Sequence, residues 1–139
     1  MTREKSGGTR PDKYNRLGEY MTMLVRSRMP TMFRALSDST RLRILHLLKR
    51  GELCVCDLMQ ILRIPQAKTS RHLGYLRKAG LVTVREEGLW SYYSLAPAFG
   101  SLHRKLLSCV DECGSEMPAI AADSRRADRL GKGGGCCPP

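Results

Sequence analysis

Apolar residues recur every three or four positions through the first part of the chain, which is the spacing of an amphipathic helix. The first such stripe comprises Tyr14, Leu17, Met21, Leu24 and Val25. It predicts either a helix that packs on a partner or a weakly ordered extension. Residues 1–29 are therefore expected to form a basic N-terminal extension, partly helical, ahead of the main domain.

The pattern between residues 30 and 80 predicts four helices. Pro30 fits the first turn of one helix, and polar residues 37–40 supply N-cap candidates for a second, which ends near Gly51. A third helix covers residues 57–62, and a fourth runs from Gln66, just after Pro65, to Gly80. Two helices joined by so short a turn favour a helix-turn-helix unit.

Beyond Gly80 the period of the apolar residues changes from 3.6 to 2. Residues 81–85 and 89–95 predict two strands, with residues 86–88 as the hairpin turn between them. A last helix starts at Pro97 and keeps an apolar side as far as Cys113. We expect a mainly α fold with a small β-hairpin, a winged helix-turn-helix domain over residues 30–117. The glycine-rich end predicts a flexible C-terminal tail over residues 118–139.

The chain carries a net charge of +11, and residues 1–50 alone account for +8, from twelve Lys/Arg and four Asp/Glu. This balance suits a polyanionic partner such as DNA, RNA or an anionic lipid surface, although it also fits a merely solvated surface. The sequence contains no run of eighteen apolar residues, so it predicts no transmembrane span. The N-terminus also lacks the apolar core of a signal peptide. We expect a cytoplasmic protein that binds nucleic acid and has no membrane partner.

The fourth helix has two faces. At about 100° per residue, Thr69, Leu73 and Leu76 fall on a core side, whereas the opposite side and the N-terminal end carry residue types suited to DNA. Gln and Arg pair with base edges, and Lys and Ser bind phosphate. An isolated helix of this kind is more often just solvated, but the hairpin that follows favours DNA binding and adds a second phosphate contact. The predicted DNA-binding residues are Gln66, Lys68, Ser70, Arg71, His72, Tyr75 and Arg85.

Three segments resemble the ArsR/SmtB family of metal-responsive repressors. Residues 32–45 (MFRALSDSTRLRIL) are similar to the opening of the family's domain, and residues 70–82 to its recognition helix and wing entry. Residues 51–58 (GELCVCDL) resemble the metal-binding box of the arsenic- and antimony-sensing members. The resemblance implies a homodimer joined through its N- and C-terminal helices. It also implies binding to a two-fold symmetric double-stranded operator, with derepression of arsenic-resistance genes when the inducer binds.

Six cysteines provide the candidate inducer site. As(III) and Sb(III) are soft ions that favour thiolates, and three thiolates neutralise a trivalent ion. Cys54 and Cys56 are the first candidates, although on an ideal helix they lie about 200° apart. They can share one ion only if the start of the third helix is distorted or not helical. Ligation is therefore expected to deform the helix-turn-helix and to release DNA.

The third ligand is open, because Met59 occupies the position where the arsenic box often has another cysteine. Cys136 and Cys137 lie on a glycine tether that can reach the box in the same subunit or across the dimer. Cys109 and Cys113, four residues apart on one helix face, are less favoured ligands. Each pair also has a plainer interpretation. The cysteines of the box and those at 109 and 113 could simply pack as small apolar residues, and the last two could belong to an inert tail.

Other functions would account for some of these charge, DNA-binding and cysteine features. A thiol-redox switch would replace ion capture by disulfide formation. A sensor of the same fold could instead bind Cd(II), Pb(II) or, less readily, Zn(II), which usually takes four ligands and often histidine. A methylated trivalent arsenical needs only two thiolates and fits a two-cysteine box. A non-specific nucleic-acid binder would explain the charge but not the cysteines. The chain has no Cys-x5-Arg phosphate loop, so we do not expect an enzyme.

Overall fold

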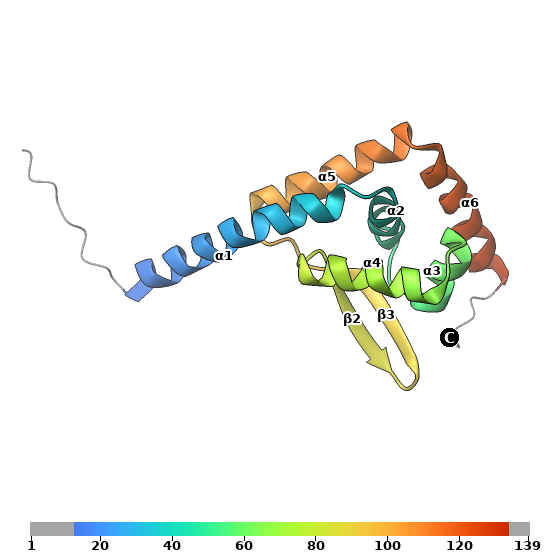
Figure 1. The fold of residues 1–139 in the computed structure, drawn as a ribbon, viewed down its shortest axis with the longest axis horizontal. Coiled ribbons are helices and arrows are strands. Elements are labelled where there is room, and N and C mark those ends of the chain that lie inside the picture. Colours follow the sequence, from blue (N-terminus) through green and yellow to red (C-terminus); the bar gives the residue numbers. More distant parts are fainter. Residues whose placement is uncertain (1–12, 134–139) are drawn as a thin grey trace, which may run out of the picture.

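A long helix, α1 (Lys13–Leu36), opens the computed structural model, which describes residues 13–133. Its N-terminal half projects away from the other helices (Figure 1). The prediction of a separate helix beginning at Pro30 is wrong, because Pro30 lies inside α1. An internal proline forfeits one backbone hydrogen bond, but the apolar pattern continues past it. Met32 and Ala35 are buried and fix the end of the helix to the core.

The second helix, α2 (Ser39–Leu48), lies at the centre of the fold and contacts every other helix. It begins after Asp38, whose carboxylate accepts a hydrogen bond from the Arg41 N–H at 3.0 Å. This confirms that the N-cap lies among residues 37–40. The apolar side of α2 is almost fully buried and comprises Ile44, Leu45, Leu47 and Leu48.

The helix-turn-helix is formed as predicted, by α3 (Val55–Leu62) and α4 (Gln66–Lys78). The turn begins at Arg63, whose backbone is left-handed (φ 57°) and whose N–H donates to the Met59 carbonyl at 2.9 Å. Pro65 directly precedes α4, and its carbonyl accepts from the Thr69 N–H at 3.0 Å. Because the residue before a proline avoids the helical region, α3 ends and α4 starts within three residues.

Three antiparallel strands form the sheet in the order β1-β3-β2: β1 (Leu53–Cys54), β3 (Trp90–Leu95) and β2 (Val82–Glu87). Strands β2 and β3 are the predicted hairpin, here called the wing, which extends beyond α4 (Figure 1). Strand β1 was not predicted. The turn is shorter than expected, because Glu86 and Glu87 belong to β2 and Leu89 follows Gly88 in the turn. The left-handed Gly88 (φ 60°) allows this two-residue connection.

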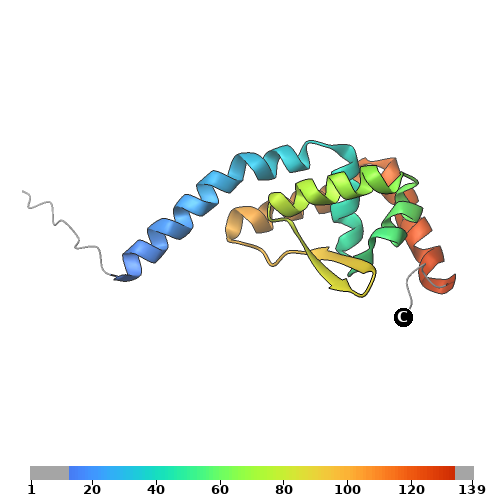
Figure 2. The same cartoon turned by 60° about the horizontal axis from the view of Figure 1, so that its bottom comes forward.

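Two helices complete the described chain, α5 (Ser101–Glu116) and α6 (Pro118–Gly133). The prediction of a flexible tail from residue 118 is wrong as far as residue 133. Ile120, Asp123, Ala127 and Leu130 recur at helical spacing and give α6 an inner face that packs against α2, α3 and α5. Figure 2 shows α6 beside α3 at the end of the molecule opposite the projecting half of α1. Helix α6 therefore belongs to the folded domain, which extends past the expected boundary at residue 117.

The core is one apolar cluster to which α1 to α5 and β2 contribute, with Ala127 and Leu130 of α6 packed against it. Its centre is almost purely aliphatic, and its fully buried large members include Ile44, Leu45, Leu47, Leu58, Ile61, Leu73, Leu76 and Leu81. The predicted fold class, a mainly α winged helix-turn-helix with a small β-hairpin, is confirmed, and β1 extends the hairpin to three strands. None of the helices within residues 13–133 has both the length and the apolarity needed to cross a membrane.

Candidate DNA interface and cysteine site

Helix α4 presents the predicted polar face to solvent. Thr69, Leu73 and Leu76 are fully buried, and the Thr69 hydroxyl donates to the Pro65 carbonyl at 3.0 Å, which fixes the first turn against the core. The opposite side therefore points outward. It contains no acidic residue, so its charge is positive only. The exposed predicted contacts on this helix are Gln66, Lys68, Ser70, Arg71 and Tyr75.

His72 is half-buried at the edge of this face. Its Nδ1 lies 3.8 Å from a carboxylate oxygen of Asp38. Burial lowers the pKa of His72, and the nearby Asp38 charge opposes this effect without reversing it. The imidazole is therefore mostly neutral near pH 7. His72 can offer DNA a hydrogen bond but little positive charge.

Tyr75 is held by Arg41, a residue that the sequence analysis did not connect with the interface. The Arg41 guanidinium lies 4.2 Å from the centroid of the Tyr75 ring, a cation–π contact. Arg41 also donates to the carbonyls of Ala35 at 2.8 Å and Arg34 at 2.9 Å, at the C-terminal end of α1. One side chain thus joins α1, α2 and the recognition helix α4. No local sequence pattern signals such a contact across three helices.

Arg85 lies in strand β2, within the segment predicted as a strand, and its guanidinium has carboxylate partners. It donates to Glu52 at 2.6 and 3.3 Å and to Glu87 at 2.5 Å, and lies 4.6 Å from the Tyr92 ring centroid. Hydrogen bonds to Glu52 and Glu87 raise the pKa of Arg85. A phosphate contact would require Arg85 to exchange these carboxylates for phosphate oxygens, so this role stays a prediction.

The two box cysteines lie where the sheet meets the helix-turn-helix. Cys54 ends β1 with an extended backbone (φ −81°, ψ 161°) and caps α3, its Sγ accepting from the Asp57 N–H at 3.4 Å. Cys56 is the second residue of α3. Cys54 precedes the helix, so the angle of about 200° that would separate Cys54 and Cys56 on an ideal helix does not apply. A shared ion site requires such a non-helical start. Cys54 is buried and Cys56 half-buried, and each is disulfide-bonded in this structure.

The remaining cysteines are distributed differently. Cys109 and Cys113 are free thiols on α5, the first exposed and the second half-buried. The predicted ligands Cys136 and Cys137 lie outside the described residues. Within residues 13–133, no group of three or more His, Cys, Asp or Glu side chains is arranged to hold a metal ion. This part of the chain does not by itself supply three thiolates at one point.

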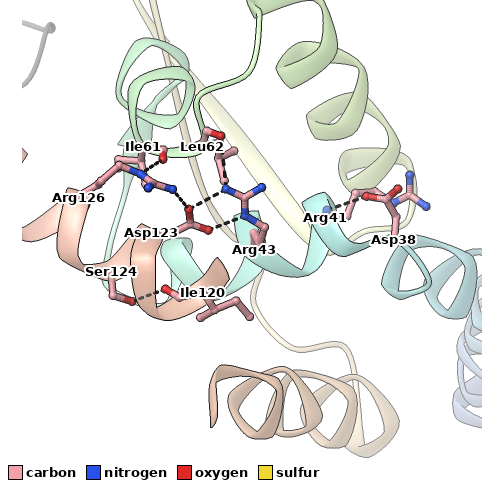
Figure 3. Close-up of polar contacts among 9 residues, drawn as sticks. All are labelled: Asp38, Arg41, Arg43, Ile61, Leu62, Ile120, Asp123, Ser124 and Arg126. Carbon is pink, nitrogen blue, oxygen red and sulfur yellow. Dashed lines mark hydrogen bonds and ion pairs between the residues drawn. The ribbon is translucent and has the colours of Figure 1, made fainter. Parts of the chain in front are cut away.

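An ion-pair network that the sequence analysis missed fixes the C-terminal end of α3 (Figure 3). Asp123 of α6 is 1% exposed and accepts two hydrogen bonds of 2.7 Å from Arg43 of α2. Arg126 donates to Asp123 at 2.6 Å and to the Ile61 carbonyl at 2.5 Å, while Arg43 reaches the Leu62 carbonyl at 3.4 Å. Side chains from α2 and α6 thus bind the last carbonyls of α3. The same helix carries the cysteine box at its other end.

Residues 38–84, from the N-cap of α2 to the middle of β2, match the family model of the arsR family of bacterial regulatory proteins. The arsenic resistance transcriptional regulator ArsR1 of Pseudomonas putida is 38% identical over 104 residues, covering 74% of this chain and 80% of that protein. The arsenical resistance operon repressor of Escherichia coli is 39% identical over 108 residues, covering 76% and 92%. The chain belongs to the arsR family.

The chain is also similar to regulators with other names. A cadmium resistance transcriptional regulatory protein, the CadC homolog of Staphylococcus aureus, is 40% identical over 85 residues, covering 60% of this chain and 70% of that protein. Reduced HlyU from Vibrio cholerae superposes with a TM-score of 0.56 at 25% identity, covering 70% and 96%. The homodimeric winged helix-turn-helix domain Mb0332 of Mycobacterium bovis has a TM-score of 0.56, with 80% and 91% covered, but at 24% identity it shows the fold alone. As an arsR-family member, the chain is a helix-turn-helix transcription regulator and not an enzyme.

Proposed function

We propose that this arsR-family protein is a homodimeric repressor that leaves its operator when As(III) or Sb(III) is captured by cysteine thiolates, so that arsenic-resistance genes are expressed. The observation that carries the proposal is the position of Cys54, which belongs to strand β1 and also caps α3. A thiol there connects ion capture to the wing, through the pairing with β3, and to the helix-turn-helix, through α3. The names of the two arsenic-resistance relatives support this choice of inducer.

Capture at Cys54 would act on the wing through the sheet. Cys54 pairs with Tyr92 of β3, and Tyr92 in turn lies beneath Arg85 of β2. If an ion shared with Cys56 displaces Cys54, both the strand pairing between β1 and β3 and the N-terminus of α3 shift. DNA binding needs the wing and α4 in one relative position, so an ion that prefers another position releases DNA.

Operator recognition is assigned to α4. Gln66 and Arg71 offer pairs of hydrogen bonds to base edges, whereas Lys68 and Ser70 suit phosphate. The rim of the proposed interface consists of His72, Tyr75 and Arg85. In a two-fold dimer, the two copies of α4 would enter major grooves about 34 Å apart, which matches an operator with two symmetric half-sites.

The proposed dimer uses α1 and α5. The projecting half of α1 leaves large apolar side chains in water: Leu17 is 64%, Tyr20 57% and Met23 70% exposed. Large apolar groups gathered on one exposed element mark an interaction surface. A second copy of the chain is the partner that a symmetric regulator requires, and the M. bovis domain of the same fold is a homodimer.

The third thiolate is proposed to come from Cys136 or Cys137. The last turns of α6 lie close to the start of α3, since Ala127, Leu130 and Gly131 line a small hollow together with Leu53 and Asp57. Three further residues lead from Gly133 to Cys136, and an extended chain covers about 10 Å over that length. This proximity and the short tether support the tail cysteines as the source of the third thiolate. Cys109 and Cys113 on α5 are the less favoured source.

A second candidate function keeps the DNA interface but changes the signal. Cys54 and Cys56 are each disulfide-bonded in this structure, which favours a thiol-redox switch. Oxidation of two thiols by hydrogen peroxide would form one disulfide and two molecules of water. The resulting covalent constraint at the start of α3 would alter the same junction. Cd(II) and Pb(II) are alternative inducers of the metal-capture type, in keeping with the cadmium-resistance relative.

The test is a fluorescence anisotropy titration of reduced protein on DNA from upstream of its own gene. Arsenite is expected to release the DNA from wild type and from the matched control Cys109→Ser/Cys113→Ser, which removes two free thiols. The Cys54→Ser/Cys56→Ser variant is expected to stay bound, and Cys136→Ser/Cys137→Ser to need more arsenite. Release by hydrogen peroxide but not by arsenite would instead establish the redox switch. DNA binding that neither reagent disturbs would contradict both.

A further inference from the structure

A cavity of about 370 Å³ opens directly beside the cysteine box. Its wall includes Cys54, Cys56 and Met59 at the box, and Leu89 and Trp90 at the tip of the wing. Gln66, the first residue of the recognition helix, lies on the same wall. The volume falls in the range of small-molecule sites. It is far larger than a single ion bound by thiolates would fill.

Apart from the cysteines, four of the seven residues that line the cavity are apolar: Val55, Met59, Leu89 and Trp90. Met59 contributes a thioether and Trp90 an indole, both half-buried, and the side chain of Leu89 is 99% exposed at the wing turn. A fully exposed leucine at the rim of a cavity gains by covering an apolar ligand. Two cysteines and several apolar side chains lining one cavity suit a ligand that is thiophilic at one end and hydrocarbon at the other.

We infer that this cavity binds a trivalent organoarsenical, R–As(OH)₂, with arsenic on Cys54 and Cys56 and the organic group R against Met59, Leu89 and Trp90. The inference rests on the proposed function and specifies its ligand class. With both thiols reduced, two As–S bonds form and two As–O bonds break. The two hydroxyl groups leave as water with the thiol protons, and no electron is transferred.

This ligand also accounts for Met59 in the box. The third valence of arsenic in R–As(S)₂ is taken by carbon, so two thiolates complete the binding. A third thiolate at position 59 would face the hydrocarbon group, whereas a methionine side chain packs against it. The bound ligand would lie between the first residue of α4 and the wing, where it can alter the spacing of the two DNA-reading elements.

The test compares arsenite, methylarsenite and phenylarsenite as probes in the DNA-release titration with reduced full-length protein. We expect phenylarsenite to release half of the DNA at a concentration at least about tenfold lower than methylarsenite, because more hydrocarbon leaves water. Met59→Ser and, separately, Leu89→Ser are expected to reduce this phenyl-to-methyl ratio several-fold. Comparing ratios between variants cancels the intrinsic difference in thiol affinity between the two arsenicals.

Leu89→Ser keeps the test valid if Met59→Ser does not fold, because the Leu89 side chain is almost fully exposed. Trp90 is the single tryptophan of the chain, so its emission gives a second readout. It is expected to change with phenylarsenite in wild type and not in Cys54→Ser/Cys56→Ser. A phenyl-to-methyl ratio that is the same in wild type and both variants would overturn the inference, while release by arsenite would leave the proposed function standing. If none of the three probes releases DNA, the proposed function itself is wrong.

Discussion

Arg43 and Asp123 are 80 positions apart in the chain, yet their side chains form a two-fold hydrogen-bonded ion pair with both distances at 2.7 Å. The Asp123 side chain is 1% exposed and that of Arg43 16%. Arg126 adds a second cation to the same carboxylate. Through the Ile61 and Leu62 carbonyls, this network connects α6 to the end of α3, one turn before the recognition helix begins.

Replacing Asp123 by Asn is therefore expected to destabilise the protein strongly, because two guanidinium groups lose their buried carboxylate. The expected loss in the free energy of unfolding is about 3 kcal/mol, the lower end for a broken buried pair, since both arginines keep some contact with water. Urea denaturation measures it. Asp128→Asn is the matched control on the same helix, because Asp128 pairs with Arg50 at the surface and should cost about 0–1 kcal/mol. Equal losses for the two variants would show that the network does not hold the fold.

Substitutions on α4 should separate base reading from phosphate binding. Arg71→Ala is expected to weaken operator binding by about 1–3 kcal/mol and to lower the preference for operator over random DNA. Lys68→Ala should weaken both kinds of DNA alike and reduce the slope of log affinity against log salt by about 1. Arg129→Ala, which removes the same charge from an exposed position on α6, is the control. An unchanged sequence preference in Arg71→Ala would remove Arg71 from the base-reading set.

The carboxylates around Arg85 give a direct test of the wing. If Arg85 contacts phosphate, Glu87 competes with DNA for its guanidinium. Glu87→Gln is then expected to raise DNA affinity about two- to fivefold, the effect of one exposed ion pair. Glu86→Gln removes an equal charge from the neighbouring position of β2 and serves as the control. The gain in DNA affinity should be larger for Glu87→Gln than for Glu86→Gln, and this difference should vanish when Arg85→Ala is added to both. If the difference in DNA affinity persists without Arg85, Arg85 is not the residue that contacts phosphate.

His103 makes stability depend on pH. It is 1% exposed, its Nδ1 accepts from the Phe99 N–H at 2.9 Å, and burial lowers its pKa. The fold therefore favours the neutral form of His103, and this contribution to stability is complete at pH values above the ordinary histidine pKa of about 6.5. As the pH falls below that value, the unfolded chain takes up a proton before the folded one. The free energy of unfolding should then decrease by up to about 1.4 kcal/mol per pH unit from this residue.

The measurement is chemical denaturation at several pH values between 5 and 7.5. His103→Gln, which keeps a side-chain acceptor but does not titrate, is expected to show a flatter profile than wild type. His72→Gln is a useful comparison, because the pKa of His72 is also lowered but its side chain is less buried. Parallel profiles for wild type and His103→Gln would exclude His103 as the source of the acid sensitivity.

The DNA-reading half of the fold could be predicted because its signals are local. Pro65 separates α3 from α4, Thr69, Leu73 and Leu76 mark the inner face of α4, and the change of period after Gly80 marks the wing. Each of these depends on neighbours within a few residues. The assignment of the α4 faces followed from helix geometry alone.

What the sequence did not reveal depends on distant partners. Strand β1 is only two residues long and exists because Cys54 and Leu53 pair with β3. Two of the ion-pair partners, Glu52 for Arg85 and Arg43 for Asp123, come from distant positions that no periodicity relates to them. Helix α6 is a different case. The sequence contains its helical apolar spacing, but the glycines and charges around it led to the prediction of a flexible tail. Pro30 was misplaced because proline is allowed both at the start of a helix and, at a cost, inside it.

The most direct test of the account is the reciprocal linkage between the box and DNA. The affinity of reduced protein for arsenite should be measured with and without saturating operator DNA, and compared with the affinity for DNA with and without arsenite. If capture at Cys54 and Cys56 causes release, each ligand weakens the other by the same factor, and the factor falls to one in Cys54→Ser/Cys56→Ser. Arsenite binding that is equally tight on free and DNA-bound protein, or an undiminished factor in that variant, would contradict the account.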